Sequence, residues 1–166
     1  DPVRYYLLRE IPAWEDGDFS YKKFEDRYNG DFANGLRNLV ARVTALGEKT
    51  IITNYELRIT NYELNTLIKE VQQNYEVAIR EFRFHSALEY IWRMIKAADK
   101  CINEEKPWEQ EKPHVIVDLA LAIVEIARLL EPFLPETAEK IRAQISFKGQ
   151  EMKIKKGGGL FPRLLS

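Results

Sequence analysis

The sequence VIVDLALAIVEIARLLEPFLP, from Val115 to Pro135, is the most apolar stretch of the 166-residue chain and indicates its fold class. It also contains four charged side chains, which are Asp118, Glu125, Arg128 and Glu131. Charges at such positions would be costly inside a lipid bilayer. We therefore interpret the stretch as a helix that is buried on most of its sides, and not as a membrane span.

The segments around this stretch repeat apolar residues every three or four positions, which is typical of helices with one buried face. The longest such segment runs from Tyr21 to about Leu46, although Gly30 and Gly35 weaken the helical prediction there. The other expected helices span residues 3–10, Leu64–Ile79, Phe84 to about Ile102, Val115 to about Leu130, and a short segment from Pro135. The pattern predicts an all-α fold, a bundle of about five to six helices.

Two segments do not follow the helical period. The tail SFKGQEMKIKKGGGLFPRLLS is expected to be an irregular C-terminal strand or arm that packs back on the bundle. A seven-residue unit that begins ITNYEL occurs at Ile52–Arg58 and again at Ile59–Asn65. Two copies are fewer than the three or four that indicate a coiled coil. We interpret the repeat as a duplication tolerated in an exposed loop or helix extension.

Composition restricts the class of protein. The net charge of −1 gives the whole domain no electrostatic attraction to nucleic acid or to an anionic membrane. The single cysteine, Cys101, excludes an internal disulfide and fits a reducing compartment, most simply the cytoplasm. The two histidines, His85 and His114, do not provide the spacing of a zinc site, so no bound metal is expected.

Sequence signatures of a catalytic centre are missing. The chain contains neither a GxxxxGK[ST] phosphate loop nor a GxGxxG turn after a strand. The glycine-rich KKGGGLF lacks the strand–helix context of a phosphate-binding loop, so we interpret it as a flexible turn. No motif supports a Cys–His pair built on Cys101. We therefore expect no catalytic residues in this chain.

A polar stripe follows the long second helix. Its members, spaced three, four and four residues apart, are Asp31, Asn34, Asn38 and Arg42. Asparagine is a poor helix former, so two on one face need an explanation. An amide offers donors and an acceptor, and a guanidinium offers a fixed fork of donors, so together they suit the edges of exposed bases. On this chemistry alone, hydrogen bonds between helices or simple solvation would explain the stripe more simply.

Trp108 lies in the charged stretch KCINEEKPWEQEK, residues 100–112. Pro107 fixes the backbone before it, and the neighbouring glutamates make deep burial of the segment unfavourable. Single-stranded RNA is read by stacking its bases on aromatic rings and bonding their edges. That role would suit Trp108, although a lid between two helices explains a lone tryptophan more simply.

Several motifs together resemble those of the methionyl-tRNA synthetase family, of class I. They are DPVRYYLLREIPAWEDGDFS, FEDRYNGDFANGLRNLVARV, INEEKPW, EPFLPETAEKI and the terminal LFPRL, in the family's order and approximate spacing. The resemblance covers nearly the whole chain and departs from the family around residues 47–65, where the repeat lies. It is to the C-terminal, anticodon-binding helix bundle of these enzymes.

The resemblance implies a domain organisation and a parent enzyme. Residues 1–20 would be a connector helix and loop that follows a missing catalytic domain. Residues 21–142 would form the anticodon-binding bundle, with the repeat-containing insertion at residues 47–65. Residues 143–166 would form the C-terminal arm packed on the bundle. The family's HIGH and KMSKS signatures, which bind ATP and methionine, do not occur here. We therefore expect a piece of a longer methionine–tRNA ligase, inactive by itself and without a cofactor of its own, because ATP and methionine would bind the missing domain.

The resemblance also implies the binding residues. The family's anticodon readers match Asn38 and Arg42, which would bond the first base of the CAU anticodon, and Trp108, which would stack on the anticodon with Pro107 orienting its ring. Asn34 lies on the same stripe. The implied partners are initiator and elongator methionine tRNAs and the protein's own catalytic domain, with no DNA or membrane partner. The alternatives are a related class I synthetase with another anticodon, or a stand-alone helical module that binds another protein.

Overall fold

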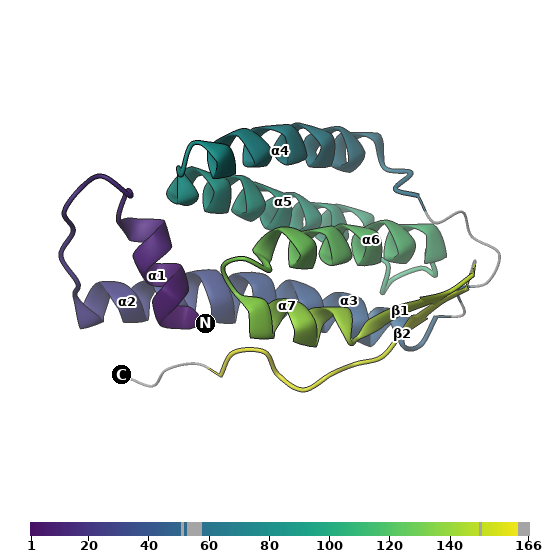
Figure 1. Ribbon diagram of the computed structural model, residues 1–166. Coiled ribbons are helices and arrows are strands. Elements are labelled where there is room, and N and C mark those ends of the chain that lie inside the picture. The colour runs from purple at the N-terminus through teal and green to yellow at the C-terminus, as the bar shows by residue number, and fades with distance from the viewer. Residues whose placement is uncertain (51, 53–57, 150, 163–166) are drawn as a thin grey trace.

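The computed structural model describes residues 1–50, 52, 58–149 and 151–162. Most of these residues are helical, so the all-α prediction is confirmed (Figure 1). The helices are α1 (Pro2–Glu10), α2 (Tyr21–Arg27), the π-helix η1 (Tyr28–Leu36), α3 (Arg37–Gly47), α4 (Tyr62–Arg80), α5 (Phe84–Glu105), α6 (Pro113–Leu130) and α7 (Pro135–Arg142). Two short strands follow them, β1 (Ile145–Lys148) and β2 (Glu151–Ile154).

The predicted long second helix is present and has a wider π-helical middle. Elements α2, η1 and α3 follow one another without a break, and both Gly30 and Gly35 lie within η1. A Cβ built on Gly35 would come within 3.6 Å of the Gly30 carbonyl oxygen and 3.9 Å of Trp92 Nε1. The two glycines thus lie where the helix has its wider pitch, and they do not end it.

Helix α6 occupies the centre of the bundle, as its sequence predicts. Twelve of its 18 residues are buried. In Figure 1, α4, α5 and α6 lie in succession above the long α2–η1–α3 helix, and α1 crosses that helix. Across the part of the chain that the structure describes, no helix is both long and apolar enough to cross a membrane. The apolar stretch therefore forms the core of the bundle.

The one buried carboxylate in α6, that of Asp118, ties the entry of α4 to the core. It is 2% exposed and accepts hydrogen bonds from Thr60 N (2.7 Å), Thr60 Oγ1 (2.9 Å) and Asn61 N (2.8 Å). Asn61 caps α4, because its Oδ1 accepts a hydrogen bond from Leu64 N (2.9 Å). The second copy of the ITNYEL unit is thus the N-terminal cap and first turn of α4. The first copy lies mostly outside the described residues.

The C-terminal tail packs back on the bundle, but its first part is regular. Residues of β1 and β2 form an antiparallel hairpin in which Ile145 pairs with Ile154. The hairpin is stable here because Met152 and Ile154 alternate with exposed residues and are buried. Beyond β2 the arm runs back along the molecule (Figure 1), and the buried Phe161 ring stacks on Phe32 with centroids 4.5 Å apart.

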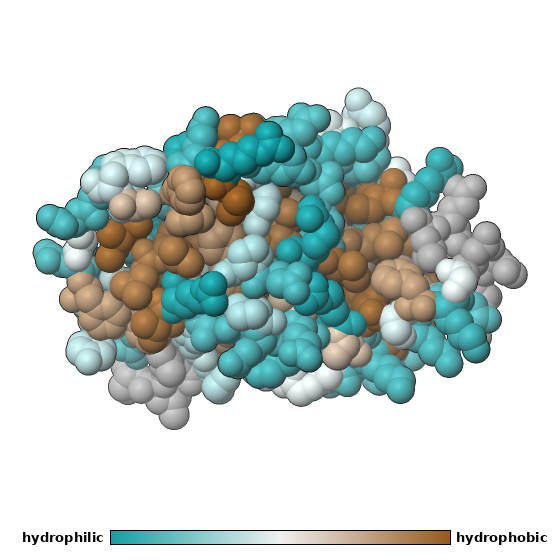
Figure 2. Space-filling view, in the orientation of Figure 1, coloured by the Kyte–Doolittle hydropathy of each residue, from teal (hydrophilic) through white to brown (hydrophobic). Residues whose placement is uncertain are grey.

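Apolar side chains reach the surface in more than one region of the molecule. Figure 2 shows apolar side chains exposed over the end that holds α1. The exposed large side chains of this region are Val3, Leu7, Trp14, Phe19 and Tyr21. The polar stripe of the second helix lies elsewhere, along η1 and α3.

Candidate functional site

A hollow of about 470 Å³ opens on the surface where α3 faces α5. Its lining residues are Asn34, Asn38, Ala41, Arg42, Ala45, Asp99 and Lys156. Three residues singled out from the sequence therefore line one hollow, because four-residue spacing places Asn34, Asn38 and Arg42 on one face. The fourth member of the predicted stripe, Asp31, does not line it.

Asp31 belongs to a separate contact near the N-terminus. Its Oδ2 accepts a hydrogen bond from Tyr5 Oη (2.7 Å) and lies 3.4 Å from Arg27 Nη1. Burial of the Tyr5 hydroxyl, together with the charge of Asp31, raises the pKa of Tyr5 well above its usual range. Asp31 therefore connects α1 to η1, and the surface stripe begins at Asn34.

The guanidinium of Arg42 is held by two side chains of α5. Its Nη1 donates to Asp99 Oδ1 (2.8 Å) and its Nη2 donates to Asn103 Oδ1 (2.7 Å). Asn103 Nδ2 in turn donates to Asp99 Oδ2 (3.2 Å), which closes a ring of three side chains. The guanidinium plane is thereby fixed by two different acceptors, and among the described residues its remaining N–H groups have no acceptor.

Trp108 lies beside this guanidinium. The centre of its ring is 5.4 Å from Arg42 Cζ, within cation–π distance. The side chain is 49% exposed, whereas the preceding Pro107 is buried. Trp108 is therefore no simple lid over the core, since half of its surface faces solvent.

The turn that carries Trp108 is fixed at both ends. Lys106 ends α5 in a left-handed conformation with φ of 45°. At the other end Lys112 Nζ donates to the Glu105 carbonyl oxygen and to Glu105 Oε2, both at 2.8 Å. The hydrogen bond from Lys112 lowers the pKa of the Glu105 carboxyl. This closed turn holds the ring next to α3.

The two asparagines present amide groups to the same hollow. Asn38 Nδ2 donates to the Asn34 carbonyl oxygen (3.0 Å), and both side chains are exposed. That bond orients the Asn38 amide along the helix, and within the described residues its Oδ1 accepts no hydrogen bond. The site thus combines an oriented amide, a fixed guanidinium and a half-exposed aromatic ring.

Three residues of the site were not predicted. Asp99 and Asn103 are four residues apart on α5, so their spacing was a signal that they share a face. Nothing in the sequence connects either with Arg42, which is 57 residues from Asp99. Lys156 carried no local signal, because only the path of the arm brings it to the hollow.

Comparisons with known proteins show what the chain is similar to. A family profile described as "tRNA synthetases class I (M)" matches residues 1–44. Methionine–tRNA ligase of Clostridium acetobutylicum is 36% identical over 189 residues, and that of Bacillus subtilis is 34% identical over 192 residues. Each alignment covers 99% of this chain and 29% of the relative. The chain thus spans somewhat less than a third of the length of these curated relatives.

A solved structure has the same fold over the same extent. The apo form of Mycobacterium tuberculosis methionyl-tRNA synthetase superposes with a TM-score of 0.85 at 26% identity, over 99% of this chain and 39% of that one. The complex of that enzyme with methionyl-adenylate gives a TM-score of 0.82 at 25% identity. The chain is therefore homologous to a region of methionine–tRNA ligase, a class I aminoacyl-tRNA synthetase.

Proposed function

We propose that this chain is the anticodon-binding domain of a methionine–tRNA ligase and that it recognises the CAU anticodon of methionine tRNA. One observation carries the proposal. In a chain homologous to that ligase over 99% of its length, Arg42 packs on the half-exposed ring of Trp108 beside the exposed amide of Asn38. These are the groups that read an unpaired base, a flat ring for stacking and fixed polar groups for the base edge.

The first anticodon base, a cytosine, fits the polar groups of the hollow. Its edge offers an amino donor next to ring-nitrogen and carbonyl acceptors. Asn38 Oδ1 accepts from the amino group, and the unused N–H groups of Arg42 donate to the acceptors. Another base offers a different order of donors and acceptors, which leaves groups of the site unpaired.

Stacking on Trp108 supplies the part of the affinity that does not depend on base identity. Arg42 covers part of the ring, and the exposed remainder receives an anticodon base. Such stacking contributes about 1–3 kcal/mol per base. A domain with a net charge of −1 can therefore bind RNA without a general electrostatic attraction.

Asp99 and Asn103 have a positioning role in this proposal. Without acceptors on α5, the long Arg42 side chain would sample many rotamers and lose entropy on binding. Their hydrogen bonds at 2.8 Å and 2.7 Å fix it before RNA arrives.

The remaining parts of the proposal concern the whole enzyme. Methionine and ATP bind a catalytic domain outside this chain, and the ligation of methionine to initiator and elongator tRNA takes place there, in the cytoplasm. The exposed apolar side chains at the α1 end, such as Val3 and Leu7, provide a contact surface for that domain.

The test is binding of this chain to two RNA stem-loops, one with a CAU loop and one whose first cytosine is replaced by uracil. We expect the replacement to weaken binding by about 1–3 kcal/mol, and Asn38→Ala to reduce that difference. Equal affinity for both loops would contradict anticodon reading. Tighter binding of another anticodon would indicate a different class I synthetase, and a protein ligand without RNA affinity would indicate an interaction module.

A further inference from the structure

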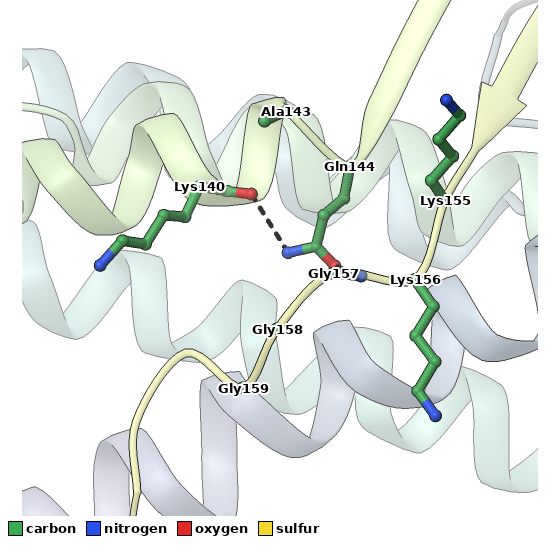
Figure 3. A pocket seen from close by; sticks show the side chains of 8 residues that line it. All are labelled: Lys140, Ala143, Gln144, Lys155, Lys156, Gly157, Gly158 and Gly159. Carbon is green, nitrogen blue, oxygen red and sulfur yellow. Dashed lines mark hydrogen bonds between the residues drawn. The ribbon is translucent and has the colours of Figure 1, made fainter.

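A second hollow of about 470 Å³ lies next to the hollow of Asn38 and Arg42, which we call the base-reading site. It is formed at the glycine run of the C-terminal arm, residues 157–159. Its lining residues are Lys140, Ala143, Gln144, Lys155, Lys156, Gly157, Gly158 and Gly159 (Figure 3). The proposed anticodon contacts do not use this motif, which as a sequence predicted only a flexible turn. The structure gives the glycine run a fixed position.

One side chain anchors the glycine run to the end of α7. Gln144 Oε1 accepts a hydrogen bond from Gly157 N (3.0 Å), and Gln144 Nε2 donates to the Lys140 carbonyl oxygen (3.1 Å). A Cβ on Gly157 would lie 2.5 Å from Gln144 Cδ, so any other residue there would have to displace the Gln144 side chain. The hydrogen bond at Gly157 therefore fixes the position from which Gly158 and Gly159 continue the chain.

The next two residues expose their backbone. A Cβ built on Gly158 or Gly159 would meet no atom within 4 Å. Their amide N–H groups donate no hydrogen bond to any of the residues that the structure describes. Glycine backbone without side chains lets a ligand such as a phosphate group come close to the N–H groups.

The charge around the segment is positive. Lys140, Lys155 and Lys156 flank it, and in the described ranges no carboxylate pairs with any of their ammonium groups. The acidic side chain in contact with the segment is Glu48, whose Oε1 accepts a hydrogen bond from Lys156 N (3.2 Å). Glu48 thus holds the backbone of Lys156, and its single negative charge is smaller than the combined positive charge of the three lysines.

Lys156 connects the two sites. It lines the hollow at the glycine run and also the hollow of Asn38 and Arg42. In Figure 3 its side chain extends away from Gln144, on the opposite side of the segment from Lys155. Because each base is joined to its phosphate through one sugar, a base in the hollow of Asn38 and Arg42 would have its phosphate close to the residues that line that hollow, and Lys156 is one of them.

We propose that Lys156 and the backbone N–H groups of Gly158 and Gly159 bind a backbone phosphate of the RNA strand whose base is read by Asn38 and Arg42. This inference rests on the proposed function and adds to it a sequence-independent contact. It explains how a chain of net charge −1 can hold RNA, since the positive charge is concentrated beside the base-reading site.

The test compares Lys156→Gln with Lys22→Gln, a matched change on the exposed surface of α2. Affinity for the CAU stem-loop is measured over a range of salt concentrations. We expect Lys156→Gln to bind about threefold to tenfold more weakly at low salt and to reduce the salt slope by about 0.7, as for one lost phosphate contact on a single strand. The preference for CAU over the uracil-substituted loop should be unchanged, and Lys22→Gln should behave as the parent protein.

The outcomes separate this inference from the proposed function. If the parent protein does not distinguish the two loops, both are wrong. If it distinguishes them and Lys156→Gln has unchanged affinity and salt slope, only the phosphate contact is wrong. Equal losses for both lysine variants would also overturn it, because they would reveal a general charge effect.

Amide chemical shifts test the backbone part. We expect the N–H resonances of Gly158 and Gly159 to move on addition of the CAU stem-loop, and to move less in Lys156→Gln. Unmoved glycine resonances with bound RNA would exclude the backbone contact. If inorganic phosphate alone saturates these shifts and the stem-loop does not displace it, the segment is a site for a small phosphate compound and not for RNA.

Discussion

Two tryptophans, one within α5 and one just beyond its C-terminal end, are in opposite environments. Trp92 is 6% exposed and its ring packs on Tyr5 and Phe32, with centroids 4.8 Å and 6.2 Å away. Trp108, just beyond the end of the helix, is 49% exposed and its ring lies beside Arg42. The same residue type therefore serves the core within α5 and, in our proposal, RNA beyond its C-terminal end. The elements packed against each ring decide which of the two roles that ring has.

Replacing Trp92 should have the largest effect in this comparison. Trp92→Ala removes a buried ring that joins α5 to α1 and η1, and a buried tryptophan cut to alanine costs about 3–5 kcal/mol. Urea unfolding followed by circular dichroism measures the loss. Trp108→Ala is the control and should change the free energy of unfolding by less than about 1 kcal/mol. Similar losses of unfolding free energy in both variants would contradict the difference between a core role for Trp92 and a surface role for Trp108.

Cys101 reports how far the buried environment extends along α5. It lies between the two tryptophans, is 8% exposed, and burial raises the pKa of its thiol to about 11. Because the thiolate is the reactive form, we expect alkylation by iodoacetamide at pH 8 to be about 100-fold slower in the folded protein than in urea. Below that pKa the rate should rise about tenfold per pH unit, and it should level off only near pH 11. Fast alkylation at pH 8 would show that Cys101 is exposed and that the buried part of α5 ends before this residue.

Trp108→Ala should reduce RNA affinity without unfolding the protein. The loss expected for one stacking platform is about 1–3 kcal/mol, measured with the CAU stem-loop at low salt. Trp108→Phe keeps a smaller ring and should recover part of the affinity. Unchanged affinity for the alanine variant would show that the exposed ring has another role.

Removing the carboxylate that holds Arg42 should have the smallest effect. Asp99→Ala deletes a half-exposed ion pair, and such pairs contribute about 0.2–1 kcal/mol. We expect a loss of RNA affinity of about two- to fivefold, with a smaller preference for CAU and little change in stability. Asp99→Asn, which keeps an acceptor for Arg42, should recover most of the preference. A structural role alone would instead lower stability and leave the preference intact.

The fold was predictable because its signals are local. The apolar period of α6 and the other long helices follows from side chains three and four residues apart, whatever their neighbours. The exceptions need contacts from elsewhere. The π-helical pitch of η1 has no signal in the apolar period, and the hairpin of β1 and β2 consists of two short strands whose alternation is too brief to identify alone.

The candidate site was predictable in part. Asn34, Asn38 and Arg42 share one helix, so their spacing placed them together, and the structure puts all three at one hollow. The charged surroundings of Trp108 argued against deep burial, but its binding role was implied only by the family resemblance, and its contact with Arg42 bridges 66 residues of sequence. Which of these residues contact RNA remains a prediction from resemblance and chemistry.

The sequence by itself determined the helical class, the buried central helix and the chemical groups available for binding. Periodicity and residue type depend on neighbours along the chain, and they are read without knowing the packing. The tertiary structure alone decided that Asp99 and Asn103 hold Arg42, that Asp31 serves another contact, and that Lys156 reaches the same hollow. These pairings join elements far apart in the chain, and they exist only because the core fixes α3, α5 and the arm against one another.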